Sequence, residues 1–321
     1  MLLPIFFLLG GLGILIAGGE GLVRGAASMA KKIGIKPIVI GLTIVAFGTS
    51  APELIVNIFS AVQGNTDLAV GNVIGSNIVN ILLILGISSM IYPLAVQRAT
   101  VWKEIPFALL GAAMVFIMGN DFLIDGKVLN EMTRSDGISY MGFFLIFIYY
   151  TITIAKGEKG GEDENNDITL YSWSTSLLLT FGGIFALFVG GKLLVDNAIL
   201  LAEQAGLSEA FIGFTIVAVG TSLPELITSV IAALHKQDDL AIGNIIGSNI
   251  FNVFWILGLS SIIRPLPFNP SMNIDLVVNI VATLLLFAFM FIDTKHRLNR
   301  WQGGIFILLY IVYILFAIYR G

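Results

Sequence analysis

The stretch GTSAPELIVN carries an ionisable glutamate, Glu53, inside a segment that is otherwise apolar. At 3.6 residues per turn, one helix face in this region holds Ala46, Thr49, Ser50 and Glu53. Pro52 has no backbone N–H, so the carbonyl oxygen of Gly48, four residues earlier, loses its donor. The distortion is expected to loosen the neighbouring carbonyl oxygens of Ala46 and Thr49 as well, which makes them candidate main-chain ligands. A carboxylate, hydroxyls and free carbonyl oxygens on one face predict the binding of a hard cation.

A second polar stripe follows in the next segment, which reads GNVIGSNIVN. Asn72, Ser76 and Asn80 are spaced four residues apart, so they also share one helix face. Asn72 has two open interpretations, either support of an ion ligand or a hydrogen bond between helices. The glycines in both stretches are interpreted as sites of close helix packing.

The same pattern returns 172 residues later in the chain. Residues 41–93 and 213–265 are identical at 31 of 53 positions without a gap, which identifies a duplication. The second copy supplies Ala218, Thr221, Ser222 and Glu225, followed by Asn244, Ser248 and Asn252. Asn244 leaves the same two interpretations open as its counterpart in the first copy. Together the copies offer two carboxylates with hydroxyl, amide and carbonyl oxygens.

Hard oxygen ligands of this kind suit Ca²⁺, which takes about 6–8 of them, and they also suit Na⁺. Mg²⁺ fits less well, because it gives up its hydration water reluctantly. The structural alternative is that Glu53 and Glu225 are protonated and bonded to a neighbouring helix. An unpaired acid within a membrane segment is nevertheless a functional residue by default. Its duplication in one sequence frame therefore favours cation binding.

The composition places the chain among membrane proteins. Of its 321 residues, 57% are hydrophobic and 12% are charged, whereas soluble proteins have about 25% charged residues. The absence of cysteine excludes disulfides and thiolate metal sites. The formal net charge of -4 gives no sign of a nucleic-acid partner. The first apolar segment lacks a basic flank and a cleavage site, so it is interpreted as a retained span.

A transmembrane helix needs about 20 apolar residues, and ten segments of the chain meet this requirement. They lie near residues 2–29, 37–62, 67–92, 101–120, 138–155, 170–202, 209–234, 239–263, 274–293 and 300–319. Residues 156–169 are polar and acidic, and are interpreted as a solvated linker. The predicted fold is an all-α membrane protein of ten transmembrane helices, in two five-helix halves of residues 1–155 and 170–321.

Five helices per half mean that the second half enters the membrane from the opposite side, which makes an inverted repeat. This plan places a substrate site near the middle of the membrane, where the halves meet. Eleven lysines and arginines fall on the side of the linker and four on the other side. The linker 156–169 is therefore expected in the cytoplasm, with both termini outside the cell membrane.

The two repeated regions resemble the alpha repeats of the cation/calcium exchanger superfamily, in particular those of prokaryotic sodium/calcium exchangers. Those repeats carry G-T-S-x-P-E followed by G-N-x-x-G-S-N-x-x-N/D. The chain reads GTSAPE and GNVIGSNIVN within residues 37–92, and GTSLPE and GNIIGSNIFN within residues 209–263. The resemblance covers essentially the whole chain. It implies a secondary antiporter that exchanges Na⁺ for Ca²⁺ by alternating access, without a cofactor, at a site that needs only one chain.

The resemblance also implies a set of ion ligands. It implies Ca²⁺ coordination by Glu53 and Glu225 together with oxygens of Thr49 and Thr221. It implies Na⁺ sites that add Ala46, Ser50, Ser76, Ala218, Ser222 and Ser248, and it places Asn80 and Asn252 along the centre. Several relatives, including potassium-dependent exchangers, have Asp where this chain has Asn252. This difference argues against K⁺ co-transport.

Two buried carboxylates suggest how exchange is coupled. An empty site would hold two repelling, poorly solvated charges, so only a site filled by Ca²⁺ or by several Na⁺ should cross the barrier readily. The glycine-rich segments 2–29 and 170–202 are hypothesised to slide over the remaining helices. Two i, i+4 pairs in these segments are interpreted as structural ion pairs, namely Glu20 with Arg24 and Lys192 with Asp196.

Other functions fit the sequence less well. A Ca²⁺/H⁺ exchanger would use both glutamates as proton carriers, whereas the many hydroxyl and amide groups favour Na⁺. A channel does not require ligands on both halves of an inverted repeat. An enzyme would need a nucleophile–base pair or a motif such as H-E-x-x-H, which the sequence lacks, and His235 and His296 fall at predicted helix ends. A passive scaffold would not explain the duplicated carboxylates.

Overall fold

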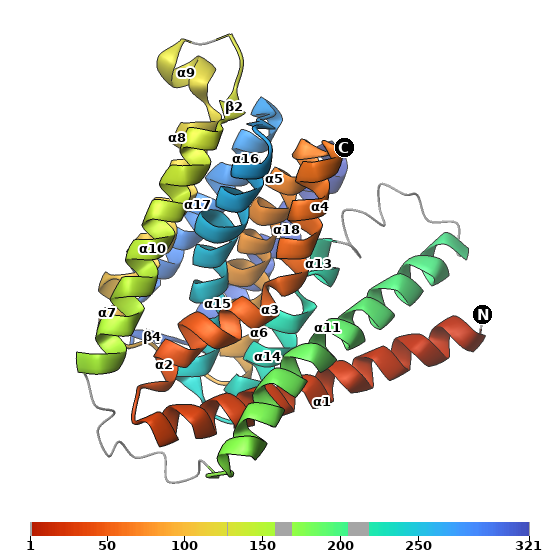
Figure 1. Cartoon of the computed structure of the whole chain (residues 1–321), viewed down its shortest axis with the longest axis vertical. Coiled ribbons are helices and arrows are strands. Elements are labelled where there is room, and N and C mark those ends of the chain that lie inside the picture. The colour runs from red at the N-terminus through yellow and green to blue at the C-terminus, as the bar shows by residue number, and fades with distance from the viewer. Residues whose placement is uncertain (1, 127, 158–168, 205–217, 321) are drawn as a thin grey trace.

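The structure is a computed structural model that describes residues 2–126, 128–157, 169–204 and 218–320. Its secondary structure is helical apart from four two-residue strands (Figure 1). Eight of the described helices are long and apolar enough to span a membrane, and a bent pair makes a ninth span. The predicted segment 209–234 begins outside the described residues, and its described part includes a shorter apolar helix. The count of ten therefore stays a prediction.

The first half begins with α1 (Leu2–Ile33). Its second span consists of α2 (Pro37–Ile40), η1 (Gly41–Val45), α3 (Ala46–Thr49) and α4 (Ala51–Gln63). The third consists of α5 (Thr66–Ile78), η2 (Val79–Ile84) and α6 (Leu85–Ile91). The half ends with β1 (Leu94–Ala95), α7 (Arg98–Trp102), α8 (Glu104–Gly119), α9 (Asp121–Asp125), β2 (Glu131–Met132) and α10 (Arg134–Gly157).

The second half begins with α11 (Trp173–Gln204). The described part of the next segment holds α13 (Ala218–Gly220) and α14 (Leu223–Leu234). The following span consists of α15 (Asp238–Ile250), η4 (Phe251–Leu257) and α16 (Gly258–Ile263). The half ends with β3 (Leu266–Pro267), η5 (Pro270–Met272), α17 (Asn273–Phe289), β4 (Arg297–Leu298) and α18 (Arg300–Arg320).

The second span bends by 48° between α3 and α4. Pro52 lies in the first turn of α4, where its missing N–H is tolerated, so one helix ends at Thr49 and the next starts at Ala51. The second half repeats this break, because residues 221–222 separate α13 from α14 and Pro224 lies in the first turn of α14. The predicted interruptions are confirmed, and each leaves a glutamate in the first turn of the helix that follows.

Three segments, η1, η2 and η4, are π-helical, and no pattern in the sequence predicts them. A π-helical turn is rare and is often found at functional sites, because the wider turn redirects the side chains that follow it. The segments η2 and η4 contain Asn80 and Asn252, respectively, and occupy equivalent places in the two halves. The segment η1 ends directly before Ala46. All three therefore adjoin the predicted polar stripes.

The spans α5–η2–α6 and α15–η4–α16 form the centre of the bundle. Of their most apolar windows, 72% and 83% respectively are buried, against 22–44% for the other single-helix spans. Glycine allows α15 to lie directly on the first polar stripe, since a Cβ added to Gly247 would lie 2.7 Å from the Cβ of Ala46. Likewise, a Cβ added to Gly41 would lie 3.1 Å from the Cα of Gly243. The packing interpretation is confirmed for these glycines.

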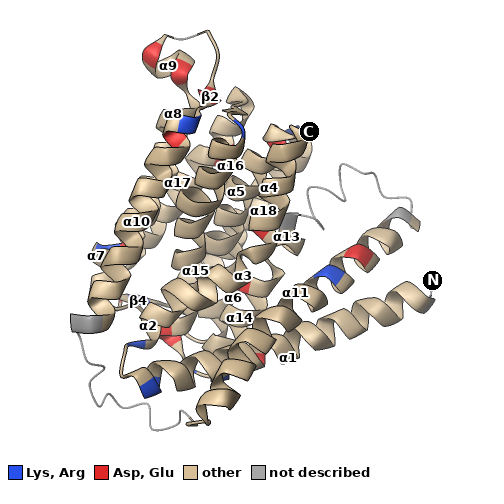
Figure 2. Cartoon of the chain, in the orientation of Figure 1, with Lys and Arg blue, Asp and Glu red and all other residues tan. Residues whose placement is uncertain are grey.

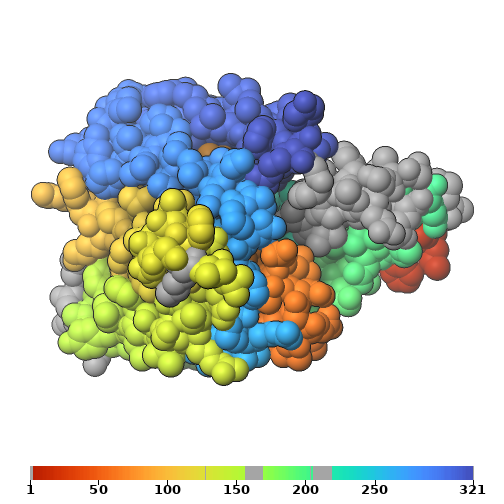
Figure 3. Space-filling model, turned by 90° about the horizontal axis from the view of Figure 1, so that it is seen from above, coloured from red at the N-terminus to blue at the C-terminus, as the bar shows by residue number. Residues whose placement is uncertain are grey.

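Helices α1 and α11 run in opposite directions and pack on each other along much of their length (Figure 1). A Cβ added to Gly18 would lie 2.9 Å from the carbonyl oxygen of Gly183, and one added to Gly11 would lie 2.9 Å from that of Gly190. Seen from above, the pair extends to one side of the main bundle (Figure 3). The two long helices are therefore joined by backbone contact, and both also pack on the rest of the bundle.

Each two-stranded sheet joins the two halves of the chain. Strand β1 pairs with β4, and β2 pairs with β3, in antiparallel register. Leu94 of β1 and Leu266 of β3 are equivalent positions of the repeat, yet the two sheets lie toward opposite ends of the bundle (Figure 1). Charged residues are found mainly toward these ends (Figure 2). Equivalent parts of the two halves thus face opposite sides of the molecule.

Candidate cation site

The two repeated glutamates lie where the halves meet, and each is bonded to a serine of the other half. Ser50 donates its hydroxyl to Oε1 of Glu225 at 3.0 Å, and Ser222 donates to Oε1 of Glu53 at 3.3 Å. Both glutamates are 1% exposed and are close enough to repel each other. They occupy the first turns of α4 and α14, where the helix dipole stabilises negative charge. The fold therefore joins two buried carboxylates from different repeats.

Further hydroxyl groups of the predicted set surround these carboxylates. Ser248 donates to Oε1 of Glu225 at 3.4 Å, and Thr221 lies beside Glu53. Thr49 lies beside Glu225 and donates to Oδ1 of Asn244 at 2.9 Å. Five predicted hydroxyl residues, Thr49, Ser50, Thr221, Ser222 and Ser248, are thus brought into one neighbourhood.

Several buried oxygens in this neighbourhood have no hydrogen-bond partner in the protein. They include Oε2 of Glu53, Oε2 of Glu225, Oγ1 of Thr221, Oγ of Ser76, Oδ1 of Asn80 and Oδ1 of Asn252. Buried polar atoms are nearly always satisfied in folded proteins, because an unpaired one loses its hydration without compensation. A group of such oxygens, two of them on carboxylates, has the chemistry of a site for a hard cation.

The sequence predicts the carbonyl oxygens of Ala46 and Ala218 as main-chain ligands. The carbonyl oxygen of Ala46 accepts the backbone N–H of Ser50 at 3.0 Å and the hydroxyl of Thr49 at 3.3 Å. The break at Pro52 therefore does not free this carbonyl, because the helix continues with full bonding up to Ser50. Ala218 begins the described helix α13, and its ligand role stays a prediction.

The two asparagines with open interpretations behave differently. Asn244 donates to Oγ of Ser229 at 2.9 Å and to the carbonyl oxygen of Glu225 at 3.3 Å, while its own Oδ1 accepts from Thr49. This network favours hydrogen bonding between helices as the role of Asn244. The Nδ2 of Asn72 has no partner among the described residues.

Two asparagines that the sequence reasoning did not select lie next to the predicted ones. Asn77 accepts from Nδ2 of Asn252, and Asn249 accepts from Nδ2 of Asn80, both at 2.9 Å. The available signal was their presence in both copies of the GSN triplet. They face predicted site residues of the opposite half.

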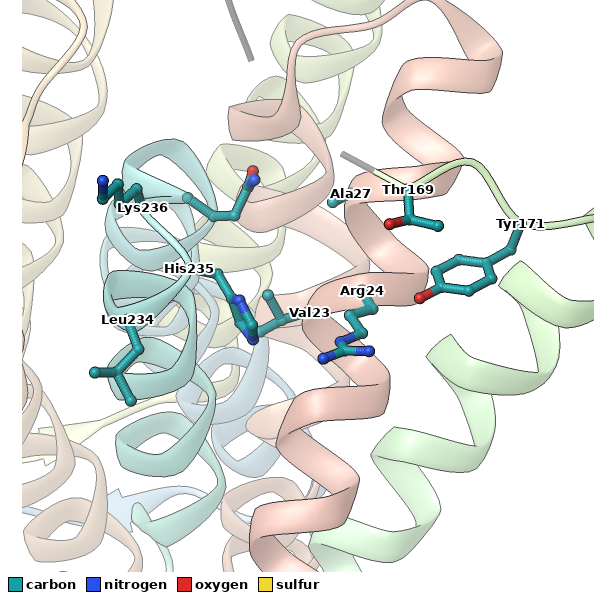
Figure 4. Close-up of a pocket in the computed structure, with 9 residues that line it drawn as sticks. Val23, Arg24, Ala27, Thr169, Tyr171, Leu234, His235 and Lys236 are labelled. Atoms are coloured by element: carbon teal, nitrogen blue, oxygen red, sulfur yellow. The ribbon is translucent and has the colours of Figure 1, made fainter. Parts of the chain in front are cut away.

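A cavity of about 390 Å³ lies elsewhere, at one end of α1 and α14 (Figure 4). Its lining consists of Val23, Arg24, Ala27, Thr169, Tyr171, Leu234, His235, Lys236 and Gln237, none of which is a predicted ion ligand. Nε2 of His235 lies 2.9 Å from both carboxylate oxygens of Glu20, which also pairs with Arg24. Lys192 and Asp196 pair at 2.9 Å, so both predicted ion pairs are confirmed.

Comparisons with known proteins show the family to which the chain belongs. The sequence profile of the family described as "Sodium/calcium exchanger protein" matches residues 3–153 and 175–319. The "Putative antiporter CaxA" of Alkalimonas amylolytica is 39% identical over 98% of both chains. The "Sodium/calcium exchanger MaX1" of Methanosarcina acetivorans is 31% identical over 97% of both chains. A solved structure of the sodium-calcium exchanger NCX_Mj superposes with a TM-score of 0.84, at 33% identity and 98% coverage of both chains.

The family profile covers both halves of the chain, and the relatives match it over nearly their whole length. The solved structure has the same fold over the same extent. The chain belongs to the sodium/calcium exchanger family of membrane transporters.

Proposed function

We propose that this chain is a secondary antiporter of the cell membrane that exchanges Na⁺ for Ca²⁺ by alternating access. The observation that carries the proposal is the group of buried, unpaired oxygens on Glu53, Glu225, Ser76, Asn80 and Asn252. A cation that passes through the site supplies the partner that these atoms lack. The membership of the exchanger family and the solved structure of a sodium-calcium exchanger support the same function.

The proposed ligands are the residues expected from the sequence, with the exception of Ala46, whose carbonyl oxygen already accepts two hydrogen bonds. They are Glu53, Glu225, Thr49, Thr221, Ser50, Ser222, Ala218, Ser76, Ser248, Asn80 and Asn252. The two glutamates supply a charge of about −2 when ionised, which one Ca²⁺ neutralises. Because all side-chain ligands are hard oxygens, the site favours Ca²⁺ and Na⁺ over softer metals.

Na⁺ is the proposed counter-ion because of the neutral oxygens. A proton needs only the carboxylates, whereas the oxygens of Ser76, Asn80 and Asn252 coordinate a metal ion but do not take up a proton near neutral pH. Ca²⁺/H⁺ exchange is the second candidate, since Glu53 and Glu225 could each carry a proton instead.

Alternating access requires a part that moves, and the α1–α11 pair is the proposed one. The pair is joined internally by glycine contacts, and it touches α14 through Gly19, where an added Cβ would lie 2.8 Å from Ile227 and Ile231. The protein changes readily between its outward-open and inward-open states only when the site holds Ca²⁺ or Na⁺. Without a cation, two ionised carboxylates in a site without water carry a large desolvation penalty.

The proposed topology is ten helices in two inverted halves, with the linker 156–169 in the cytoplasm and both termini outside. The opposite placement of the sheets that contain β1 and β3 supports the inversion. The excess of lysine and arginine on the linker side supports the orientation. One chain carries all the proposed ligands, so a monomer suffices for function.

The proposal is tested by uptake of radioactive Ca²⁺ into proteoliposomes loaded with Na⁺, with K⁺, or with an acidic interior. Uptake driven only by the outward Na⁺ gradient, and lost in both Glu53→Gln and Glu225→Gln, is the expected result. Glu104→Gln is the matched control, because Glu104 is 2% exposed and accepts a hydrogen bond from Tyr150. It is another buried carboxylate outside the proposed ligand set, and its variant should keep Na⁺-driven uptake.

Two results would change the conclusion. Uptake driven by the pH gradient without Na⁺ would identify a Ca²⁺/H⁺ exchanger. No uptake of Ca²⁺ under either gradient would contradict cation exchange altogether.

A further inference from the structure

We propose that Asn77 and Asn249 are positioning residues that aim the side-chain oxygens of Asn252 and Asn80 at the transported ion. This inference rests on the proposed cation exchange, and it adds the residues that orient two of the central ligands. The four asparagines are equivalent in pairs, because Asn77 and Asn80 lie 172 residues before Asn249 and Asn252. All four are buried, with exposed fractions of 1–3%.

The hydrogen bonds between these asparagines cross from one half to the other. Nδ2 of Asn80 donates to Oδ1 of Asn249 at 2.9 Å. Nδ2 of Asn252 donates to Oδ1 of Asn77, also at 2.9 Å. The Nδ2 atoms of Asn80 and Asn252 are thus each held by an asparagine of the opposite repeat, and the two hydrogen bonds have the same length.

The orientation of one pair is determined by a backbone carbonyl, which only accepts hydrogen bonds. Nδ2 of Asn77 donates to the carbonyl oxygen of Asn249 at 3.4 Å, so Oδ1 of Asn77 is left free to accept. That oxygen faces Asn252, whose amide must turn its nitrogen toward it. The oxygen of Asn252 therefore points away from Asn77.

The result is two amide oxygens without a partner inside the protein. Oδ1 of Asn80 and Oδ1 of Asn252 are buried and unpaired. An amide attracts a cation only through its oxygen, since its NH₂ group carries partial positive charge. If either amide were reversed, its NH₂ group would face the ion. Mutation of a residue that orients a metal ligand by a hydrogen bond typically lowers the metal affinity about 10- to 100-fold.

The same contact suits an amide at position 252, given the orientation of Asn77. An ionised aspartate there would have no hydrogen to donate, so it would be bonded only if the amide of Asn77 turned its Nδ2 toward it and gave up the carbonyl oxygen of Asn249. Asn77 and Asn252 are therefore a matched pair, and the match keeps the charge of the site at that of its two glutamates.

The experiment replaces Asn77 or Asn249 by leucine, which has nearly the same branched shape but no amide. Ca²⁺ uptake and Ca²⁺ binding by the purified protein are measured over a range of concentrations. We expect Asn77→Leu and Asn249→Leu to raise the half-saturating Ca²⁺ concentration about 10- to 100-fold. Melting temperature in detergent reports any general loss of structure.

Asn120→Leu is the matched control. Asn120 is 2% exposed and forms an amide pair with Asn273, in which each Nδ2 donates to the other Oδ1 at 2.7 Å. This variant loses a partly buried amide–amide contact between distant parts of the chain, outside the proposed ligand set. Its half-saturating Ca²⁺ concentration should stay within about twofold of that of the unmodified protein.

A double-mutant cycle shows through which ligand each residue acts. Adding Asn77→Leu to Asn252→Leu should have no further effect, because the residue that Asn77 orients is already gone. Adding Asn77→Leu to Asn80→Leu should multiply the two effects, although Asn80 is only three residues away. Asn249 should show the reverse pattern, coupling with Asn80 and not with Asn252.

The inference is overturned if the leucine variants keep the Ca²⁺ affinity, or if Asn120→Leu lowers that affinity as much as they do. It is also overturned if Asn77 couples with Asn80, and Asn249 with Asn252, within the same half. If the leucine variants do not fold, Asn77→Ser and Asn249→Ser replace them, since a serine hydroxyl is too short to hold the partner amide. Failure of the proposed function would be seen separately, as an absence of Na⁺-driven Ca²⁺ uptake by the unmodified protein. Exchange driven by H⁺ would leave the Ca²⁺ affinities and the couplings measurable.

Discussion

Ser50 and Glu225 meet across the contact between the two halves, with the serine hydroxyl 3.0 Å from the carboxylate. Ser222 repeats this relationship with Glu53 at 3.3 Å. Because each carboxylate is held by a hydroxyl of the other half, neither half contains a complete site. A movement that separates the halves on one side therefore changes the surroundings of both glutamates together.

Removal of either serine hydroxyl should weaken Na⁺ binding. We expect Ser50→Ala and Ser222→Ala each to raise the half-saturating Na⁺ concentration by about tenfold or more, because a buried hydrogen bond to a charged group is worth about 1.5–3 kcal/mol. Na⁺-dependent Ca²⁺ uptake at varied Na⁺ measures this. Ser261→Ala is the control, since Ser261 is equally buried but donates to the carbonyl oxygen of Leu257. Equal behaviour of all three variants would contradict the prediction.

A methyl group at Gly247 should disturb the contact that brings α15 onto α3. A Cβ at this position would lie 2.7 Å from the Cβ of Ala46 and 3.0 Å from the backbone of Leu42. We expect Gly247→Ala to lower the free energy of unfolding by about 1–3 kcal/mol, as overpacking does. Denaturation of the purified protein in detergent measures the change.

Gly304→Ala provides the comparison for this prediction. Gly304 lies in the helix α18, and no described atom lies within 4 Å of an added Cβ. Alanine there should be neutral or should add up to about 1 kcal/mol through its higher helix propensity. A Gly247→Ala variant as stable as Gly304→Ala would show that α15 can shift at no cost.

A cross-link between α1 and α14 should stop exchange. The chain has no cysteine, so a pair introduced at Gly19 and Ile227 is the only pair that can be oxidised. Oxidation should abolish Na⁺-driven Ca²⁺ uptake and reduction should restore it, because sliding of α1 requires this contact to change. The control pair, Gly86 and Ile307, joins α6 to α18, where an added Cβ on Gly86 would lie 2.8 Å from Ile307. Undiminished exchange by the oxidised Gly19–Ile227 protein would exclude sliding at this contact.

Aspartate at position 252 should raise the affinity for Ca²⁺ and lower the maximal rate of exchange. Asn252→Asp adds a third carboxylate, which attracts Ca²⁺ more strongly but leaves the loaded site with a net negative charge. We expect a lower half-saturating Ca²⁺ concentration together with a lower maximal rate of exchange, both read from uptake curves. Asn120→Asp, at a buried asparagine outside the proposed ligand set, should change neither quantity. A higher maximal rate in Asn252→Asp would contradict the electrostatic account.

The local features of the fold follow from the sequence, because their causes are local. The break before Glu53 is due to Pro52, whose ring and missing N–H act on the preceding turn. The sharing of one face by Asn72, Ser76 and Asn80 follows from the helical period. The duplication identifies the same groups in the second half without further information.

The sequence by itself therefore determined which residue types form the candidate site and that the two halves carry them in equal number. Only the tertiary structure decided which groups meet: Ser50 with Glu225, Asn77 with Asn252, and Glu20 with His235. These partners are 175 residues apart in the first two cases and 215 in the third. Their pairing depends on how two distant helices are rotated against each other, and a helix turned by one residue would present a different side chain. The amide orientations depend in addition on a neighbouring carbonyl, and no periodicity along the chain contains that information.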